Sequence, residues 1–370
     1  MNVLFDVHYL YFWPHFAPIW DVLQAEVADL TGFATYFSGE HPDAKLLTER
    51  VLRQAGLHVL SGEDEQSRLA SLEAHTYDLA FVGGRKPGYE IIRRQTRFVC
   101  AMAHGLGRKQ AYFTDAPLDA DVRFTEGPRH TAALRERFPD LPVELTGMSK
   151  LDPLFSSKPD LQVLRHRCQI DPARPVILWA PTFYPSSLEV LSRSVAQLAA
   201  RSEYQWIIKP HHFTLFPRQR RYKRQRKLLY RLAAKAGSIR VLPPEEYSIL
   251  PWLQLADILL SDTSSTLFEM VALNKPVVQC KKYKKRWNHL LFPSRLYRKR
   301  LDTATTDPFQ FAVTLTSARG LETALETALR DPDWLQEGRQ LTREHLFHRL
   351  DGLASQRIVT RALAGLGGAE

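Results

Sequence analysis

The sequence predicts an α/β protein made of two doubly wound, Rossmann-like domains that face a central cleft. The chain has 370 residues, which is more than one hydrophobic core usually organises. Short apolar runs alternate with amphipathic stretches along its length, and runs that are apolar throughout are typical of parallel strands buried on both faces. We expect an N-terminal domain at 1–155, a second at 156–340, and a C-terminal helical segment at 341–370 that packs across both.

Both halves of the chain repeat the same order of elements. In the first half the expected strands are 2–7, 34–37, 57–60, 78–82 and 98–103, with helices at 18–30, 43–55, 63–74 and 88–95. In the second half the expected strands are 176–180, 204–208, 238–242, 257–260 and 276–279, with helices at 188–201, 218–236, 248–256 and 265–273. The stretch 319–366 is expected to be helical. Open α/β sheets bind ligands beyond the carboxyl ends of their strands, so the loops that leave the strands are the candidate sites.

The composition is that of an ordinary globular protein, with 44% apolar and 24% charged residues. No run approaches the ~18 apolar residues that a membrane span requires. The first residues lack a basic segment followed by a continuous apolar one, so we expect no signal peptide and a cytoplasmic protein. The three cysteines, Cys100, Cys168 and Cys280, are widely separated and odd in number, which predicts reduced core residues rather than disulfides or a thiolate metal site.

The positive charge is concentrated in two segments. The net charge is +10, and residues 218–231 hold eight Lys or Arg while residues 281–300 hold nine, with no acidic residue in either. Such patches favour contact with a polyanion or an anionic membrane surface, unless they are merely solvated helix faces. The apolar residues within them are expected to insert shallowly into a bilayer. These residues are Tyr222, Leu228, Leu229, Tyr230, Trp287, Leu290, Leu291 and Phe292.

A polar turn between an expected strand and an expected helix is the first candidate binding site. Its residues are Ser261, Asp262, Thr263, Ser264, Ser265 and Thr266. Hydroxyls and free N–H groups at a helix start suit a diphosphate, and Glu269, one turn into the helix, can accept hydrogen bonds from ribose hydroxyls. The alternative interpretation is ordinary helix capping, which uses the same residue types.

Histidines follow two other expected strands. His104 comes directly after the run 98–103, and Gly105 beside it allows a tight turn and close approach of another molecule. A histidine in this position can act as a general base. Lys209 and His211 follow the run 204–208, where they can neutralise and donate to a phosphate. Each is alternatively an ordinary loop residue.

A further loop leaves the strand at 176–180 and presents Thr182 and, beyond it, Ser186 and Ser187. Their hydroxyls can point toward the same ligand as those of the polar turn. This is the third strand-exit loop with polar side chains that can face the same cleft, where a polar, phosphorylated ligand is expected to bind.

Taken together, these motifs resemble the CDP-glycerol glycerophosphotransferase family. The chain has HG followed by Lys109, APTF after a buried strand, K-x-H after the next, and SD-x-SS-x-x-F-E before a helix, in the order of that family. The resemblance implies a GT-B fold, with His104 and His211 as the catalytic histidines and the SDTSS turn as the CDP-diphosphate site. The sequence departs from the family at His212, where Pro is typical, at HGLGRK, and in its N-terminal FDVHYLYFWPHF.

The function that the resemblance implies is transfer of glycerol phosphate, or a similar polyol phosphate, from a CDP-linked donor to a hydroxyl of a lipid-linked or polymeric acceptor. The resemblance implies a role in teichoic acid or capsule synthesis. From the charge asymmetry we expect a peripheral protein on the inner face of the membrane, held there through 218–231 and 281–300. We expect no cofactor and no obligatory metal, because no D-x-D follows a strand and no His or Cys cluster has ligand spacing.

Two other functions compete with this one. A GT-B glycosyltransferase of capsule or lipopolysaccharide assembly, or more remotely a sugar-nucleotide epimerase, would share the fold and the diphosphate site. A nucleic-acid-binding protein could use the two basic segments, but the sequence has no RNP, zinc-finger or helix-turn-helix signature. We therefore expect no nucleic-acid partner.

Overall fold

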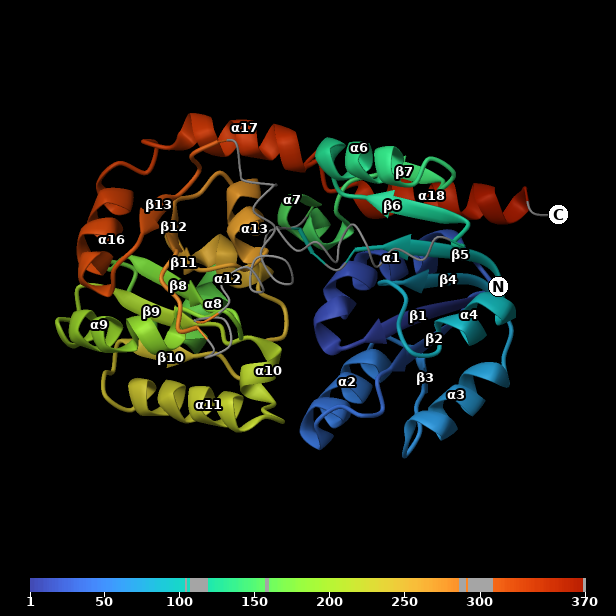
Figure 1. Cartoon of the computed structure of the whole chain (residues 1–370), viewed down its shortest axis with the longest axis horizontal. Coiled ribbons are helices and arrows are strands. Elements are labelled where there is room, and N and C mark those ends of the chain that lie inside the picture. Colours follow the sequence, from blue (N-terminus) through green and yellow to red (C-terminus); the bar gives the residue numbers. More distant parts are fainter. Residues whose placement is uncertain (104, 107–118, 157–159, 286–290, 292–308, 369–370) are drawn as a thin grey trace. The chain divides into compact units, whose positions relative to one another are not determined.

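The computed structural model describes residues 1–103, 105–106, 119–156, 160–285, 291 and 309–368. They divide into two units (Figure 1). The first contains the described residues of 1–106, 111–157 and 345–370, and the second contains those of 158–344. Each unit is built on one parallel sheet covered by helices, so the predicted architecture with two doubly wound α/β sheets is confirmed.

The sheet of the first unit has seven parallel strands in the order β3-β2-β1-β4-β5-β6-β7. Their bounds are β1 Asn2–His8, β2 Thr31–Tyr36, β3 His58–Leu60, β4 Tyr77–Val82, β5 Thr96–Met102, β6 Val122–Thr125 and β7 Val143–Leu145. The strands are added outward from β1 on one side and from β4 on the other. The order therefore reverses between β1 and β4, which is the point where such sheets bind ligands.

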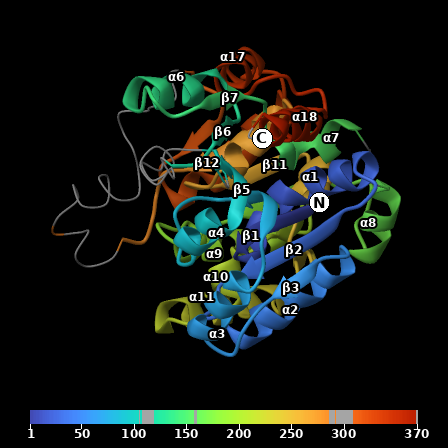
Figure 2. The same cartoon turned by 90° about the vertical axis from the view of Figure 1, so that its right-hand side faces the viewer.

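Helices cover both faces of this sheet (Figure 2). Their bounds are α1 Trp13–Glu26, α2 Pro42–Gln54, α3 Glu65–Glu73, α4 Tyr89–Gln95, α6 Pro128–Arg137, α7 Asp152–Ser156 and α18 Ala354–Gly367, with 3-10 turns η1 Leu10–Phe12 and η2 Ser149–Leu151. Side chains alternate along β1. Phe5 packs against the α1 rings of Trp13 and Trp20, whereas Leu4 packs in the opposite layer with residues of α3 and α4.

The last helix of the chain is part of the first unit. The carboxylate of Asp152 accepts hydrogen bonds from the Ala354 and Ser355 N–H groups at 3.1 and 2.6 Å and from the Ser355 hydroxyl at 2.6 Å. At the other end of α18, Gly365 lies flat against the ring of Phe98 in β5. These contacts hold α18 on the same face as α1, which it also touches.

The second unit repeats this plan with six parallel strands in the order β10-β9-β8-β11-β12-β13. Their bounds are β8 Val176–Ala180, β9 Gln205–Ile208, β10 Ile239–Val241, β11 Ile258–Ser261, β12 Val277–Cys280 and β13 Val313–Leu315. The helices are α8 Leu161–Arg167, α9 Leu188–Ala200, α10 His212–Leu215, α11 Arg220–Ala233, α12 Leu250–Leu255, α13 Thr266–Ala272 and α16 Leu321–Arg330, with η3 Ala318–Gly320 and the connecting helix α17 Gln336–Leu346. α9, α11 and α16 share one core with one face of the sheet.

Every predicted strand is present, and the helix predicted over 18–30 runs instead from Trp13 to Glu26. The sequence analysis did not identify β6, β7 or β13. The predicted C-terminal helices are confirmed as α16, α17 and α18. Among the helices that the structure describes, none combines the length and the apolar character that a membrane crossing requires.

We predict that Gly338→Ala in α17 destabilises the protein. A Cβ atom at Gly338 would lie 2.0 Å from the carbonyl oxygen of Gln310, so backbone would have to move, and overpacking of this kind costs about 1–3 kcal/mol. A lower melting temperature in a thermal-denaturation scan would show it. The matched control is Gly367→Ala in α18, where an added Cβ meets nothing within 4 Å. Equal melting temperatures for the two variants would contradict the prediction.

Candidate functional site

The carboxyl edge of the second sheet is organised by one buried carboxylate. Asp262, directly after β11, is fully buried. Its Oδ1 accepts hydrogen bonds from the backbone N–H groups of Thr182 at 3.0 Å and Thr263 at 2.8 Å. Its Oδ2 accepts from the N–H and the hydroxyl of Ser187, both at 2.8 Å. Asp262 therefore ties the turn after β11 to the loop that leaves β8.

The other residues of the predicted diphosphate turn fall into two sets. Ser261 and Glu269 are fully buried: the Ser261 hydroxyl donates to the Ala180 carbonyl at 2.6 Å, and Glu269 lies 3.5 Å from the Ser265 hydroxyl. The partly exposed residues of the turn are Thr263, Ser264, Ser265 and Thr266. The structure thus separates side chains that fix the turn from hydroxyls that a ligand can reach.

The loop after β9 brings His211 next to this edge. The Nδ1 atom of His211 accepts the N–H of Phe213 at 3.2 Å and so caps α10. Its ring packs 4.6 Å from that of Phe183, in the loop after β8. Because Nδ1 is an acceptor, the neutral ring carries its proton on Nε2, which is a hydrogen-bond donor. Lys209 is partly exposed, and its backbone N–H bonds to Trp179 in β8 at 2.9 Å.

Three of the four loops with candidate residues thus leave neighbouring strands of one sheet, β9, β8 and β11. Thr182, Lys209, His211 and the partly exposed hydroxyls of 263–266 lie at the same carboxyl edge. Within the described residues, no group of three His, Cys, Asp or Glu side chains is arranged to hold a metal ion. The donors present suit a phosphate group.

In the first unit only part of the predicted site is described. Gly105 is buried just beyond the end of β5, while His104 and Lys109 lie outside the described residues. A pocket opens at the carboxyl ends of β5 and β6 and reaches the residue before position 104. It is lined by His15, Met102, Ala103, Phe124, Thr125, Glu126, Gly147, Met148 and Ser149.

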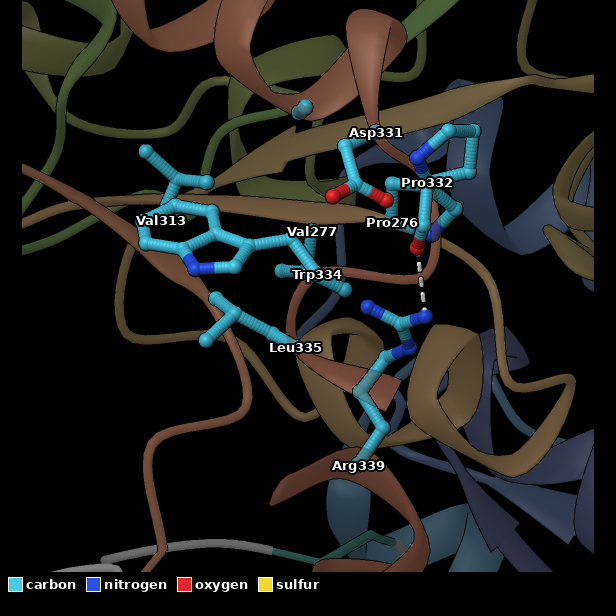
Figure 3. Close-up of a pocket in the computed structure, with 9 residues that line it drawn as sticks. Pro276, Val277, Val313, Asp331, Pro332, Trp334, Leu335 and Arg339 are labelled. Atoms are coloured by element: carbon cyan, nitrogen blue, oxygen red, sulfur yellow. Dashed lines mark hydrogen bonds between the residues drawn. The ribbon is translucent and has the colours of Figure 1, made fainter. Parts of the chain in front are cut away.

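A pocket also lies in the second unit, but at the opposite edge of the sheet (Figure 3). It is lined by Pro276 and Val277 at the start of β12, by Val313 at the start of β13, and by Trp334 and Arg339. The Arg339 guanidinium donates to the Pro332 carbonyl at 2.6 Å and fills part of the space. This pocket is far from the strand exits and contains none of the predicted site residues.

The sequence analysis missed a polar pair at the end of β1. Asp6 and His8 are both buried. Burial raises the pKa of Asp6 to about 6, and burial together with Lys86 and Arg68 lowers the pKa of His8 to about 4. The available signal was a charged residue inside an otherwise apolar run, NVLFDVH.

The basic helix α11 corrects one expectation. Tyr222 and Leu229, predicted to insert into a bilayer, are only 6% and 1% exposed and pack into the unit's interior. They are buried because they recur at helical spacing on the inner face of α11, where Leu229 packs on the sheet and Tyr222 packs on Phe183 and Tyr184 of the loop after β8. Tyr230 is 55% exposed. Of the second basic run the structure describes 281–285 and Leu291; Trp287, Leu290 and Phe292 lie outside the described residues.

The comparison with protein families decides the identity of the chain. The model of the family described as CDP-glycerol:poly(glycerophosphate) glycerophosphotransferase matches residues 138–364. The chain belongs to this family. It is therefore a transferase of the CDP-glycerol glycerophosphotransferase type, as the motifs implied. The match includes all the second-unit loops described above.

Solved structures with the same fold include members of two enzyme groups. A variant of the wall teichoic acid polymerase TagF soaked with CDPG has a TM-score of 0.68 at 13% identity, covering 99% of this chain and 89% of that chain. A putative UDP-N-acetylglucosamine 2-epimerase from Listeria monocytogenes has a TM-score of 0.60 at 14% identity, covering 99% and 97%. The S. aureus MnaA–UDP complex has a TM-score of 0.63 at 13% identity, with the same coverage. At these identities the likeness concerns the fold, which is of the predicted GT-B type. No curated protein matches the chain.

We predict that Asp262→Asn destabilises this glycerophosphotransferase by about 2 kcal/mol or more, because an amide would replace an acceptor oxygen and leave buried donors unpaired. Urea unfolding followed by tryptophan fluorescence measures the change. Ser264→Ala is the control, since its hydroxyl is partly exposed and makes one 3.3 Å contact, with the Thr266 N–H. An Asp262→Asn variant as stable as Ser264→Ala would show that the carboxylate does not hold the loops.

Proposed function

We propose that the chain transfers glycerol phosphate, or a similar polyol phosphate, from a CDP-activated donor to a hydroxyl of a lipid-linked or polysaccharide acceptor, with release of CMP. The product would be a cell-surface polymer such as teichoic acid or capsule. The observation that carries the proposal is the set of loops after β8, β9 and β11, whose hydroxyl, imidazole and ammonium groups suit a diphosphate in a chain of this family.

The donor's diphosphate would bind to the hydroxyls of Thr263, Ser264, Ser265 and Thr266 in the second unit. Thr182, Lys209 and His211 would add donors from the two neighbouring loops. His211 suits this role because its Nδ1 is engaged by Phe213 and its Nε2 carries a proton. Buried Ser261, Asp262 and Glu269 would act by fixing the turn rather than by touching the donor.

In the reaction, the acceptor oxygen attacks the β-phosphorus of the donor, and the bond from that phosphorus to the oxygen of CMP breaks. We assign removal of the acceptor proton to His104, and binding of the substrate to Gly105 and Lys109 of the same sequence motif. CMP leaves with the electron pair, and Lys209 and the Nε2–H of His211 stabilise the developing negative charge. Positioning and electrostatics then supply most of the catalysis.

A second candidate is a sugar-nucleotide enzyme, because epimerases that act on UDP-N-acetylglucosamine share the fold. A thermal-shift screen separates the two, since a ligand that binds the native state raises the melting temperature. We expect CDP-glycerol or CDP-ribitol to raise it and UDP-sugars and CMP-sugars to leave it unchanged. If only a UDP-sugar raised the melting temperature, the proposed function would be rejected in favour of the second candidate.

We predict that His211→Ala lowers both donor affinity and turnover, because a charge-assisted hydrogen bond to phosphate contributes roughly 1.5–3 kcal/mol. Calorimetry with CDP-glycerol and the rate of CMP release give the two quantities. His212→Ala, one residue on, is the matched control and is expected to change donor affinity less than threefold. Equal affinities in the two variants would remove His211 from the donor site.

We predict that His104→Ala lowers turnover by on the order of 10²–10⁴-fold, the usual contribution of a positioned acid or base, while donor affinity measured by calorimetry stays unchanged. The reason is that this histidine is assigned to the acceptor hydroxyl. A variant that releases CMP within threefold of the wild-type rate would exclude His104 as the base.

We also propose that the enzyme works at an anionic membrane surface. Helix α11 exposes five basic side chains on one side, and the Tyr230 ring is exposed on the same side. They are Arg220, Lys223, Arg224, Lys227 and Arg231. Each basic residue near an anionic bilayer contributes roughly 1 kcal/mol. Arg221 is different, because it stacks 4.0 Å from the centre of the Tyr184 ring.

We predict that the wild-type protein floats with phosphatidylglycerol vesicles at low salt and detaches as salt is raised. Replacing Arg220, Lys223, Arg224 and Lys227 by Glu should abolish flotation and spare activity on a soluble acceptor. The control reverses four exposed cations outside both runs, Arg53, Arg137, Arg319 and Arg330. Loss of soluble-acceptor activity with flotation retained would assign the patch to a polyanionic acceptor instead.

A further inference from the structure

Aromatic rings gather around the carboxyl end of β1 in the first unit. The His8 ring lies 5.3 Å from the Phe37 ring and nearly parallel to it, and 4.5 Å from the Tyr9 ring. Tyr9 stacks on Tyr11 at 5.4 Å. Tyr9, Tyr11 and Phe37 are each partly exposed at the end of the strand. We call these three residues the aromatic platform.

Two buried polar side chains next to the platform have hydrogen-bonding capacity that the described residues leave unused. Asp6 is 2% exposed, and its Oδ2 has no hydrogen-bond partner among them. His8 is 9% exposed, and its ring nitrogens make no hydrogen bond within the described part of the chain. With its lowered pKa, His8 is neutral near pH 7 and carries one donor and one acceptor nitrogen.

Asp6 and His8 stand two residues apart at the carboxyl end of β1, and the charges of Arg68, Glu65 and Lys86 act on both side chains. Unpaired buried groups of this kind cost stability unless a ligand or water satisfies them. A ligand hydroxyl both donates and accepts, so it can pair with the Asp6 carboxylate and with the His8 ring together.

The charges around Asp6 and His8 do not favour a phosphate. They are Arg68 and Glu65 of α3, Lys86 after β4 and, near His8, Glu40 after β2. The Arg68 guanidinium is occupied, because it donates to the Glu65 carboxylate, the Thr35 hydroxyl and the Pro87 carbonyl. Phosphate sites present surplus cationic donors, whereas here acids and bases balance.

An uncharged ring with an apolar face and hydroxyls at its rim fits these features. Aromatic side chains cover apolar faces, and a few placed polar groups fix the orientation of a ligand. The position of these residues at the end of β1 is also one where open α/β sheets bind ligands, because the strand order of this sheet reverses between β1 and β4.

We propose that the aromatic platform, with Asp6 and His8, binds an uncharged saccharide ring of the acceptor. The proposal rests on the proposed transferase function and narrows it: the acceptor would present a sugar, and not a glycerol phosphate unit, to this part of the first unit. The N-terminal FDVHYLYFWPHF, a departure from the family pattern, contains four of the five residues involved.

Saturation-transfer difference NMR with methyl N-acetyl-β-D-glucosaminide tests the proposal directly. Wild-type protein should transfer magnetisation to the sugar ring protons. Tyr9→Ala, which removes a platform ring, and His8→Phe, which keeps a ring against Phe37 but removes both nitrogens, should each reduce the signal at least fivefold. Tyr230→Ala, an exposed tyrosine on α11, is the matched control and should leave it unchanged. A trimer of glycerol phosphate should not displace the sugar.

Any of three results would overturn the proposal: no sugar signal with wild type, a full signal with both Tyr9→Ala and His8→Phe, or displacement by the glycerol phosphate trimer. The melting temperature of each variant shows whether it folds. If Tyr9→Ala or His8→Phe does not fold, Tyr11→Ala is used in its place. CDP-glycerol binding is measured on the same samples by calorimetry. Donor binding without sugar binding would refute this inference alone, whereas absence of donor binding in wild type would refute the proposed function.

Discussion

The carboxyl edge of the second unit depends on the carboxylate of Asp262. A parallel sheet delivers its strand ends to one edge, but the loops beyond those ends have no ladder to fix them. Asp262 supplies the missing connection, because its two oxygens accept from the loop after β8 and from its own turn. The hydroxyls of 263–266 are therefore held in place by a residue that is itself inaccessible to a ligand.

The sequence was most informative where one physical cause dominates. Strands buried on both faces must be apolar throughout, so runs such as 176–180 and 258–260 were evident, and the polar residues directly after them indicated the loops of the site. The motifs then indicated the CDP-glycerol glycerophosphotransferase family, which the family model confirms. What could not be read was which polar residues face a ligand: Ser261, Asp262 and Glu269 have the same residue types as their accessible neighbours, and only the fold shows that they are buried.

The segments that the sequence analysis missed are those whose secondary structure depends on tertiary contacts more than on the local pattern of apolar and polar residues. β6, β7 and β13 have three or four residues each, and Arg123 and Glu144 interrupt two of them. The helix expected to begin at residue 18 begins five residues earlier, at Trp13, with Pro14 in its first turn. Tyr222 and Leu229 were predicted to face the membrane because they lie among many basic residues. Their helical spacing, which directs them to the core, was not recognised.

The return of the chain to the first unit has a consequence for biosynthesis. α18 is joined to Asp152, Phe98 and α1, so the first unit is completed by residues that are synthesised after the second unit. Domains usually fold in order as they leave the ribosome. Here α18 follows the whole second unit in the sequence, so the part of the first sheet that it covers beside α1 is completed only after that unit has been translated. The first unit therefore acquires its full set of contacts only after the second unit has been synthesised.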